Sequence, residues 1–319
     1  MMNKRQLGKT GINISELAFG CVEIGIPYGI GVESEKDLLP EEEAILLLRK
    51  ALSSGVNFFD TARMYGASER ILGMAFKDMR DDVVIASKCV HLLGQDGHLP
   101  AGNKVRDIIE KSLTDSLTAL QTDYIDLYML HQANIEILES DIIQKAFSDF
   151  KSQGLIRATG VSSYSNEVSH KAITSGFWDM VQVPFNLLDQ RQGELFGVAR
   201  ENGIGIVIRS VLMKGLLSER GRNLHPALKD VEKHIGKYRE MLEGTEYSLP
   251  AFATKFALSF PEVSSVLVGI DKQQYLEEAL ETVDGDYLGG DMLERAKQLS
   301  YPDPAFLNLP YWDKMNWLR

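Results

Sequence analysis

The chain has 319 residues, of which 44% are hydrophobic and 25% charged, so it is long enough to bury a large apolar core. Its formal net charge of −11 argues against nucleic acid or an anionic membrane as a partner, because both attract clustered Lys and Arg. The N-terminus lacks an apolar signal stretch, and the only cysteines are Cys21 and Cys89. We therefore expect a cytoplasmic protein without disulfides.

Short apolar runs alternate with longer amphipathic stretches along most of the chain. Such apolar runs are typical of strands buried on both faces of a parallel sheet. Strands are predicted at residues 17–20, 57–61, 83–88, 124–130, 158–162, 180–183, 205–208 and 265–269. Helices are predicted at residues 41–53, 68–76, 104–120, 140–152, 190–201 and 272–281. This alternation favours an α/β fold, a (β/α)8 TIM barrel that forms a single domain over residues 1–319.

Three segments fall outside the repeat. The first residues predict a β-hairpin that turns at Thr10 and Gly11, ahead of the first barrel strand. A polar insertion at residues 218–246 separates the seventh strand from its helix and predicts a loop with an extra helix. The tail, residues 301–319, is rich in aromatic residues and Pro, and we expect irregular structure that lies on the barrel.

The common nucleotide-binding and metal-binding motifs are missing from the sequence. No G-x-G-x-x-G follows a predicted strand, and Gly8-Lys9-Thr10 lacks the upstream glycine of a phosphate-binding loop. No H-E-x-x-H or cluster of Asp, Glu and His predicts a metal site. A dinucleotide would therefore have to be held by other means than a Rossmann crevice.

Polar residues stand at the carboxyl ends of several otherwise apolar strands. Asp60 ends the second strand with Tyr65 in the loop that follows, Lys88 ends the third, and His131 follows the fourth. The fifth and sixth strands are followed or ended by Ser162, Ser163, Gln182 and Asn186. A cap or a solvated strand end explains each residue alone equally well. A barrel, however, brings all these ends to the rim where active sites form, so together they predict a site.

The residue types at this rim suit proton transfer to a carbonyl. Buried Lys and Asp are costly unless paired, which predicts an ion pair between Asp60 and Lys88. We expect the Lys88 ammonium to lower the pKa of Tyr65, so that its phenol gives a proton to a carbonyl oxygen. His131 would hydrogen-bond the same oxygen and orient it. With no metal or nucleophile motif, the electrons must come from a bound hydride donor.

The stretch GVNFFDTARMYGASERILG closely resembles the first signature of the aldo-keto reductases. The resemblance runs from Arg5 to about Glu281 and places the family's catalytic positions on Asp60, Tyr65, Lys88 and His131 in order. It implies a barrel that binds NADP(H) or NAD(H) across its rim. It also implies reversible reduction of an aldehyde, ketone or sugar carbonyl, with Tyr65 as general acid and base.

The resemblance also implies where the nicotinamide half and the pyrophosphate of the cofactor bind. Arg209 stands where many members stack a Tyr on the nicotinamide, and its planar guanidinium can stack instead. Lys214 falls in the segment that wraps the pyrophosphate, although a solvated loop charge is the alternative. The other expected contacts are Ser162, Ser163 and Gln182 at the carboxamide, Ser210 and Leu212 at the pyrophosphate, and Gly20, Cys21, Val22 and Asp60.

The adenosine end departs most from the family pattern. Members that bind the 2′-phosphate of NADPH often carry a Lys-Ser pair and a later Arg, where this chain has Gly269, Ile270 and Tyr275. The Asp271 carboxylate would favour a ribose 2′-hydroxyl, whereas Lys272 could meet a phosphate. Glu278 is a further expected cofactor contact. We expect NADH to be used at least as well as NADPH.

Residues 21–39, 218–246 and 301–319 are the segments from which the family builds its substrate pocket. Candidate wall residues are Ile24, Ile26, Tyr28, Phe306, Tyr311 and Trp312. Gln132 and Asn134 would suit a hydroxylated substrate such as a sugar.

The alternative function is a cofactor-sensing regulatory barrel subunit without significant turnover, because the same barrel serves as an accessory protein of membrane channels. A metal-dependent barrel hydrolase or isomerase lacks ligand residues at the strand ends. The oligomeric state does not follow from the sequence.

Overall fold

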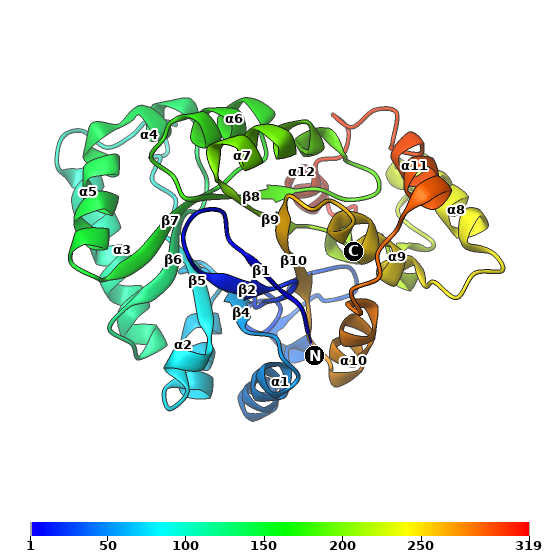
Figure 1. Ribbon diagram of the computed structural model, residues 1–319, viewed down its shortest axis with the longest axis horizontal. Coiled ribbons are helices and arrows are strands. Elements are labelled where there is room, and N and C mark those ends of the chain that lie inside the picture. The colour runs from blue at the N-terminus through cyan, green and yellow to red at the C-terminus, as the bar shows by residue number, and fades with distance from the viewer. Residues whose placement is uncertain (1, 319) are drawn as a thin grey trace.

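Eight parallel strands close into a barrel in the computed structural model, which describes residues 2–318 (Figure 1). The strands are β3 (Leu17–Gly20), β4 (Phe58–Asp60), β5 (Val84–Lys88), β6 (Ile125–Leu130), β7 (Ile156–Ser162), β8 (Met180–Pro184), β9 (Gly205–Arg209) and β10 (Val263–Gly269). They follow one another around the barrel in chain order, and β10 pairs with β3 to close it. The predicted (β/α)8 fold is confirmed, because each predicted strand is present to within two residues at either end.

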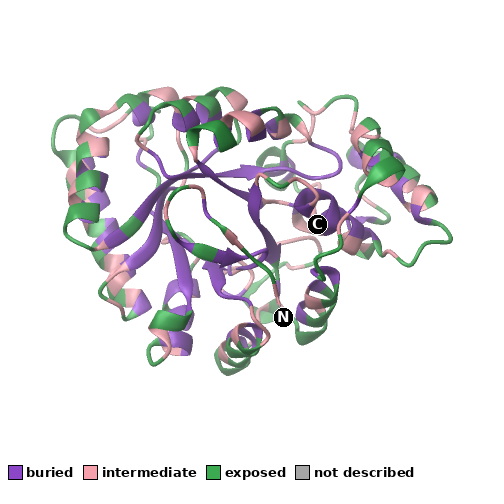
Figure 2. Ribbon diagram, viewed as in Figure 1, coloured by how far each residue is buried: buried purple, intermediate pink, exposed green. Residues whose placement is uncertain are grey.

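Helices surround the barrel and turn their apolar faces toward it (Figure 2). The predicted helices are present as α1 (Glu41–Ser53), α2 (Ser68–Phe76), α3 (Lys104–Leu120), α5 (Asp141–Ser152), α7 (Phe196–Asn202) and α10 (Gln273–Thr282). The stretch ahead of α7, η3 (Arg191–Leu195), is a 3₁₀ helix. Further helices are α4 (Ile135–Glu139), α6 (Asn166–Thr174), α9 (Leu249–Leu258) and α11 (Gly290–Gln298). None of the helices within residues 2–318 has the length and apolar character needed to span a bilayer.

The apolar spacing of the sequence accounts for these inner faces. In α5 the buried residues Ile143, Ala146, Phe147 and Phe150 recur at intervals of three and four, which places them on one side of a helix. Phe147 reaches the aromatic side chain of Tyr128 on β6, with ring centroids 5.6 Å apart. The helix layer is therefore fixed on the barrel by side chains that meet between the two layers.

A hairpin covers one end of the barrel, as the sequence predicts. Its strands β1 (Lys4–Gln6) and β2 (Asn13–Ser15) pair antiparallel, and they cross the barrel end in Figure 1. Leu7, Ile12 and Ile14 from the hairpin are buried with side chains of the barrel interior, such as Phe58 and Met129. The interior is thus filled and sealed at this end, which leaves the opposite rim for a binding site.

The insertion and the tail both contain helices. The predicted extra helix of the insertion is α8 (Lys229–Leu242), preceded by the 3₁₀ turns η5 (Glu219–Gly221) and η6 (Pro226–Leu228). The prediction of an irregular tail is wrong for part of it, because α12 (Leu309–Lys314) forms there. The Asn308 side chain caps α12 by accepting a hydrogen bond from the Tyr311 N–H at 3.0 Å. Pro310 lies in its first turn, where a missing N–H costs nothing.

An ionic cluster lies at the amino end of β6, away from the rim that carries the strand carboxyl ends. The Asp126 carboxylate is fully buried and accepts from Arg80 Nη2 at 2.7 Å and from Arg157 Nη1 at 2.6 Å. It also accepts from the Ile85 N–H of the neighbouring strand at 2.9 Å. These bonds join β5, β6 and β7, so the carboxylate is a structural group.

Substitution Asp126→Asn is expected to lower the free energy of unfolding by about 3 kcal/mol, because it leaves two guanidinium groups at the site without a counter-charge. Urea denaturation measures this change. Asp123→Asn is the matched control, since Asp123 is exposed just before the same strand and should change stability by less than about 0.5 kcal/mol. Equal effects of the two substitutions would contradict the structural role of the cluster.

Candidate active site

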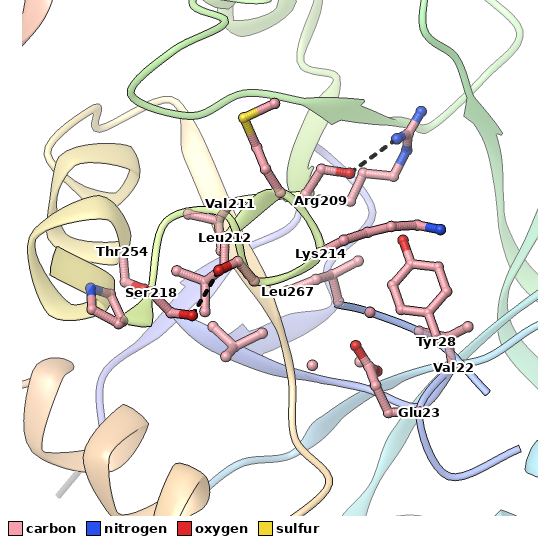
Figure 3. A pocket seen from close by; sticks show the side chains of 18 of the residues that line it. Val22, Glu23, Tyr28, Arg209, Val211, Leu212, Lys214, Ser218, Thr254 and Leu267 are labelled. Atoms are coloured by element: carbon pink, nitrogen blue, oxygen red, sulfur yellow. Dashed lines mark hydrogen bonds between the residues drawn. The ribbon is translucent and has the colours of Figure 1, made fainter. Parts of the chain in front are cut away.

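A groove of about 1220 Å³ opens at the carboxyl ends of the barrel strands. It is lined by strand-end residues including Gly20, Asp60, Ser162, Arg209 and Gly269. The loop after β9, with Val211, Leu212 and Lys214, also lines it (Figure 3). Within residues 2–318, no three His, Cys, Asp or Glu side chains are grouped so as to hold a metal ion.

The predicted ion pair between Lys88 and Asp60 lies at the base of this groove. Lys88 Nζ donates to Asp60 Oδ1 at 2.5 Å and to the Thr61 carbonyl at 2.9 Å. The other carboxylate oxygen, Asp60 Oδ2, accepts from Gln182 Nε2 at 2.7 Å. Burial lowers the pKa of Lys88, and the Asp60 charge opposes that change. Lys88 itself does not line the groove, whereas its partner Asp60 and the Asp60 partner Gln182 do.

Tyr65 lines the groove from the loop between β4 and α2. This loop is held by short hydrogen bonds: the Tyr65 N–H donates to the Ala62 carbonyl at 3.0 Å, and the Ser68 hydroxyl donates to the Cys21 carbonyl at 2.8 Å. Two glycines let it pack against the loop after β3. Gly66 has a φ of +53°, and a Cβ on Gly25 would overlap the Tyr65 carbonyl.

The expectation that Lys88 lowers the pKa of Tyr65 is wrong for this structure. Burial raises the pKa of Tyr65 well above its usual value, the Asp60 charge raises it further, and Arg209 opposes both. The Lys88 ammonium lies 5.0 Å from the centroid of the Tyr65 ring. Its charge is largely neutralised by Asp60 at 2.5 Å, which explains why it does not acidify the phenol. Tyr65 therefore holds its proton at neutral pH.

His131 faces Tyr65 across the groove. The two rings are edge to face, with centroids 5.4 Å apart and an interplanar angle of 83°. The pKa of His131 is lowered to about 2, mainly by burial and then by the charges of Lys88, His91 and Arg209 in that order. The imidazole is therefore neutral, with one N–H donor and one acceptor nitrogen. His131 Nδ1 is buried and has no hydrogen-bond partner within residues 2–318.

Most of the predicted cofactor residues line the same groove. They are Gly20, Cys21, Val22, Asp60, Ser162, Gln182, Arg209, Ser210, Leu212, Lys214, Gly269, Asp271, Tyr275 and Glu278. Ser163 is the exception. Its hydroxyl donates to the Ser165 carbonyl at 3.2 Å and accepts from the Ser165 N–H at 3.1 Å, so the hydrogen bonds of this hydroxyl are made within its own turn. Asn186 does not line the groove either, and its side chain accepts from the Leu188 N–H at 3.0 Å and donates to the Ser210 carbonyl at 3.3 Å.

Arg209 stands at the end of β9 and lines the groove. Its guanidinium stacks on the Tyr164 ring at 3.8 Å and donates to the Ser163 carbonyl at 3.2 Å. It also donates to Ser210 Oγ at 3.3 Å. The planar group is thus fixed in orientation on one side of the groove.

Two further cations lie along the groove toward its β10 side. Lys214 forms an ion pair with Asp313 of α12, and its ammonium lies 4.3 Å from the centroid of the Tyr28 ring. Its side chain is only 12% exposed, so the alternative of a solvated loop charge is wrong. Arg220 lies 3.8 Å from Asp271 and donates to the Tyr275 hydroxyl at 3.5 Å. Sequence reasoning missed Arg220, because it lies in an insertion whose polar composition resembles an ordinary surface loop.

The expected substrate wall is only partly present. Ile26, Tyr28 and Gln132 line the groove. Ile24 and Trp312 are buried in the core, Phe306 packs on Trp312, and Tyr311 is exposed on the tail. Asn134 is also not a wall residue, because its side chain accepts from the Ile137 N–H at 2.8 Å and caps α4. Lining residues that sequence reasoning missed include Glu23, Met64, His91 and Tyr164.

Comparison with known proteins gives matches over nearly the whole chain. The model of the aldo/keto reductase family matches residues 16–298. L-galactose dehydrogenase of Arabidopsis thaliana is 27% identical, covering 95% of this chain and 98% of that protein. The NADH-specific methylglyoxal reductase of Escherichia coli is 31% identical, covering 68% of this chain and 69% of that protein.

A solved structure agrees with these matches. The holo form of aldo-keto reductase AKR11C1 from Bacillus halodurans superimposes with a TM-score of 0.79 at 28% identity, covering 94% of this chain and 97% of that one. The chain therefore belongs to the aldo/keto reductase family of oxidoreductases.

Proposed function

We propose that this protein interconverts an aldehyde, ketone or sugar carbonyl and the corresponding alcohol with NAD(P)(H), and that Tyr65 is the general acid and base. One observation carries the proposal. A protonated phenol, a neutral imidazole and a buried Lys88–Asp60 pair meet at one end of a groove that is large enough for a dinucleotide. The relatives named L-galactose dehydrogenase and methylglyoxal reductase support carbonyl–alcohol chemistry.

The residues of the groove fit a dinucleotide. Arg209, Lys214 and Arg220 supply positive charge along it, which suits a pyrophosphate in a protein of net charge −11. Ser162 and Gln182 would hold the carboxamide, and Asp271 would accept the adenosine ribose hydroxyls. When bound, the nicotinamide supplies a hydride to the carbonyl carbon.

The chain's own residues handle the proton. In reduction, the Tyr65 phenol gives its proton to the carbonyl oxygen as negative charge develops there. His131, kept neutral by burial, hydrogen-bonds this oxygen without competing for the proton. The Tyr65 phenolate that forms is favoured by the positive charge of Arg209, which lowers the pKa of Tyr65. In the reverse direction, the phenolate accepts the alcohol proton.

The substrate we propose is small and hydroxylated. Gln132 lines the groove beside His131 and offers an amide to a hydroxyl group, whereas Ile26 and Tyr28 limit the apolar wall. The relative named L-galactose dehydrogenase supports this assignment.

The alternative function is that of a regulatory barrel that binds the cofactor without significant turnover. A panel of aldehydes and sugars that gives no turnover, despite tight nucleotide binding, would favour that alternative.

Substitution Tyr65→Phe is expected to lower turnover by about 10²- to 10⁴-fold, because it removes the proton donor and little else. Nucleotide affinity, measured by fluorescence titration, should stay within severalfold. Tyr311→Phe is the matched control, since this exposed tyrosine does not line the groove. Near-normal turnover of Tyr65→Phe would mean that the proton comes from another group.

The single-turnover rate of reduction, at saturating NADH, is expected to be constant between about pH 6 and about pH 9. The raised pKa of Tyr65 keeps the phenol protonated at the upper limit. The pKa of His131, about 2, keeps the imidazole neutral at the lower limit. Stopped-flow absorbance of the nicotinamide measures this rate. A titration with a midpoint inside the interval would contradict these assignments.

We expect NADH to bind at least as tightly as NADPH, because the Asp271 carboxylate accepts ribose hydroxyls and repels a 2′-phosphate. Fluorescence titration gives both dissociation constants. Asp271→Asn should move the ratio toward NADPH by about tenfold, because it also frees Arg220 for the phosphate. A preference of the unaltered protein for NADPH greater than tenfold would defeat the idea.

A further inference from the structure

Glu23 is an acidic side chain inside the groove that the proposed mechanism does not use. It follows β3, lines the groove, and is directed into the cavity near Tyr28 (Figure 3). Its Oε2 atom is buried and has no hydrogen-bond partner in the described part of the chain. The carboxyl lies against the backbone of Gly269 at the end of β10, where a Cβ would overlap it. Gly269 therefore makes room for the Glu23 carboxyl.

The cations near Glu23 are engaged elsewhere. Lys214 pairs with Asp313, and Arg220 lies 3.8 Å from Asp271. Glu23 forms no ion pair with either of them in residues 2–318. An unpaired carboxylate in a partly desolvated groove is unfavourable, and a neutral carboxylic acid is the form that such a site prefers.

The same stretch of groove is the one in which Lys214, Ser210 and Leu212 would hold the pyrophosphate. An ionised Glu23 would place a negative charge beside the doubly negative pyrophosphate, at a low effective dielectric constant. A protonated Glu23 would instead offer an O–H donor, and hydrogen bonds from such donors to anionic oxygens are short and strong. The two forms of one side chain therefore have opposite effects on dinucleotide binding.

We propose that the dinucleotide binds the form of the protein in which Glu23 is a neutral carboxylic acid, and that this carboxyl donates a hydrogen bond to the sugar–phosphate backbone of the ligand. The inference rests on the proposed dinucleotide-binding function of the groove. It makes Glu23 a pH-dependent determinant of cofactor affinity in addition to the residues that the family resemblance implies.

Glu23 titrates within the pH range in which binding can be measured. Its pKa is raised to about 8, mainly by burial and also by the Asp271 charge, whereas the Glu23 backbone N–H, Arg220 and Lys214 lower it. The other titratable groups that face Glu23 are Cys21, Tyr28 and Tyr65. Burial raises the pKa of each of these three above its usual value, so none of them competes with Glu23 in the neutral to mildly alkaline range.

The test is the dissociation constant of NADH between about pH 6.5 and about pH 9.5, measured by fluorescence titration with the whole chain. NADH lacks the 2′-phosphate, which would itself titrate. The dissociation constant should be level below about pH 8 and should rise above it, approaching about tenfold per pH unit, because each binding event then requires a proton. Glu23→Gln should remove the rise. Glu35→Gln, an exposed carboxyl in the same loop, should keep it.

Proton uptake gives a second readout that needs no variant. Calorimetric titration near pH 8, in buffers of different ionisation enthalpy, should show that the unaltered protein takes up about half a proton as NADH binds. A dissociation constant independent of pH, a rise that persists in Glu23→Gln, or no proton uptake would each overturn the role of Glu23. If NADH fails to bind at every pH to both the unaltered protein and Glu23→Gln, the proposed function of the groove fails instead.

Discussion

The buried pair of Lys88 and Asp60 is the interaction on which the rim of the barrel depends. Two opposite charges are held 2.5 Å apart with almost no contact with water, and such a pair is stable only when its remaining hydrogen bonds are satisfied. The Thr61 carbonyl and the Gln182 amide supply those bonds. Because these groups come from β4, β5 and β8, the pair fixes strand ends on separate sides of the barrel around one point. Tyr65 and His131 lie beside this point, with the Tyr65 ring 5.0 Å from the Lys88 ammonium and 5.4 Å from the His131 ring.

The electrostatics of the groove differ from those of the protein as a whole. The chain is acidic, yet the groove contains Arg209, Lys214 and Arg220, and two of these cations lie close to carboxylates of neighbouring segments. A cation held in this way keeps its position when no ligand is bound, so less side-chain freedom is lost on binding. An anionic ligand must, however, compete with the existing partner. Affinity in such a groove is therefore a difference between two ionic interactions.

Strand ends could be predicted from the sequence because they carry two independent signals. An apolar run followed by Asp60, Lys88 or His131 marks both the strand and the point at which it ends, and the barrel then places these residues together. The Asp60–Lys88 pair could be predicted in this way, but the effect of the pair on Tyr65 could not. The pKa of Tyr65 was predicted in the wrong direction, since burial and the neutralising effect of Asp60 are properties of the folded chain.

The roles of loop and tail residues were equally hard to predict from the sequence. Asn134 looks like a ligand for a hydroxyl group, but its side chain is used as a helix cap. Trp312 looks like a pocket wall, but the formation of α12 turns it into the core. Glu23 gave no signal at all, because only the close approach of Gly269 shows that a carboxyl fits there. Composition cannot distinguish these outcomes, since each depends on which surface a short segment covers.

The contact between Gly25 and the Tyr65 carbonyl joins two loops that have separate tasks. One loop forms a wall of the groove and the other carries the phenol, and no side chain lies between their backbones at this point. Backbone in direct contact transmits displacement without the compliance that an intervening side chain would give. A displacement of the wall loop at Gly25 would therefore be passed directly to the loop that carries Tyr65, so the two loops are mechanically coupled at this point.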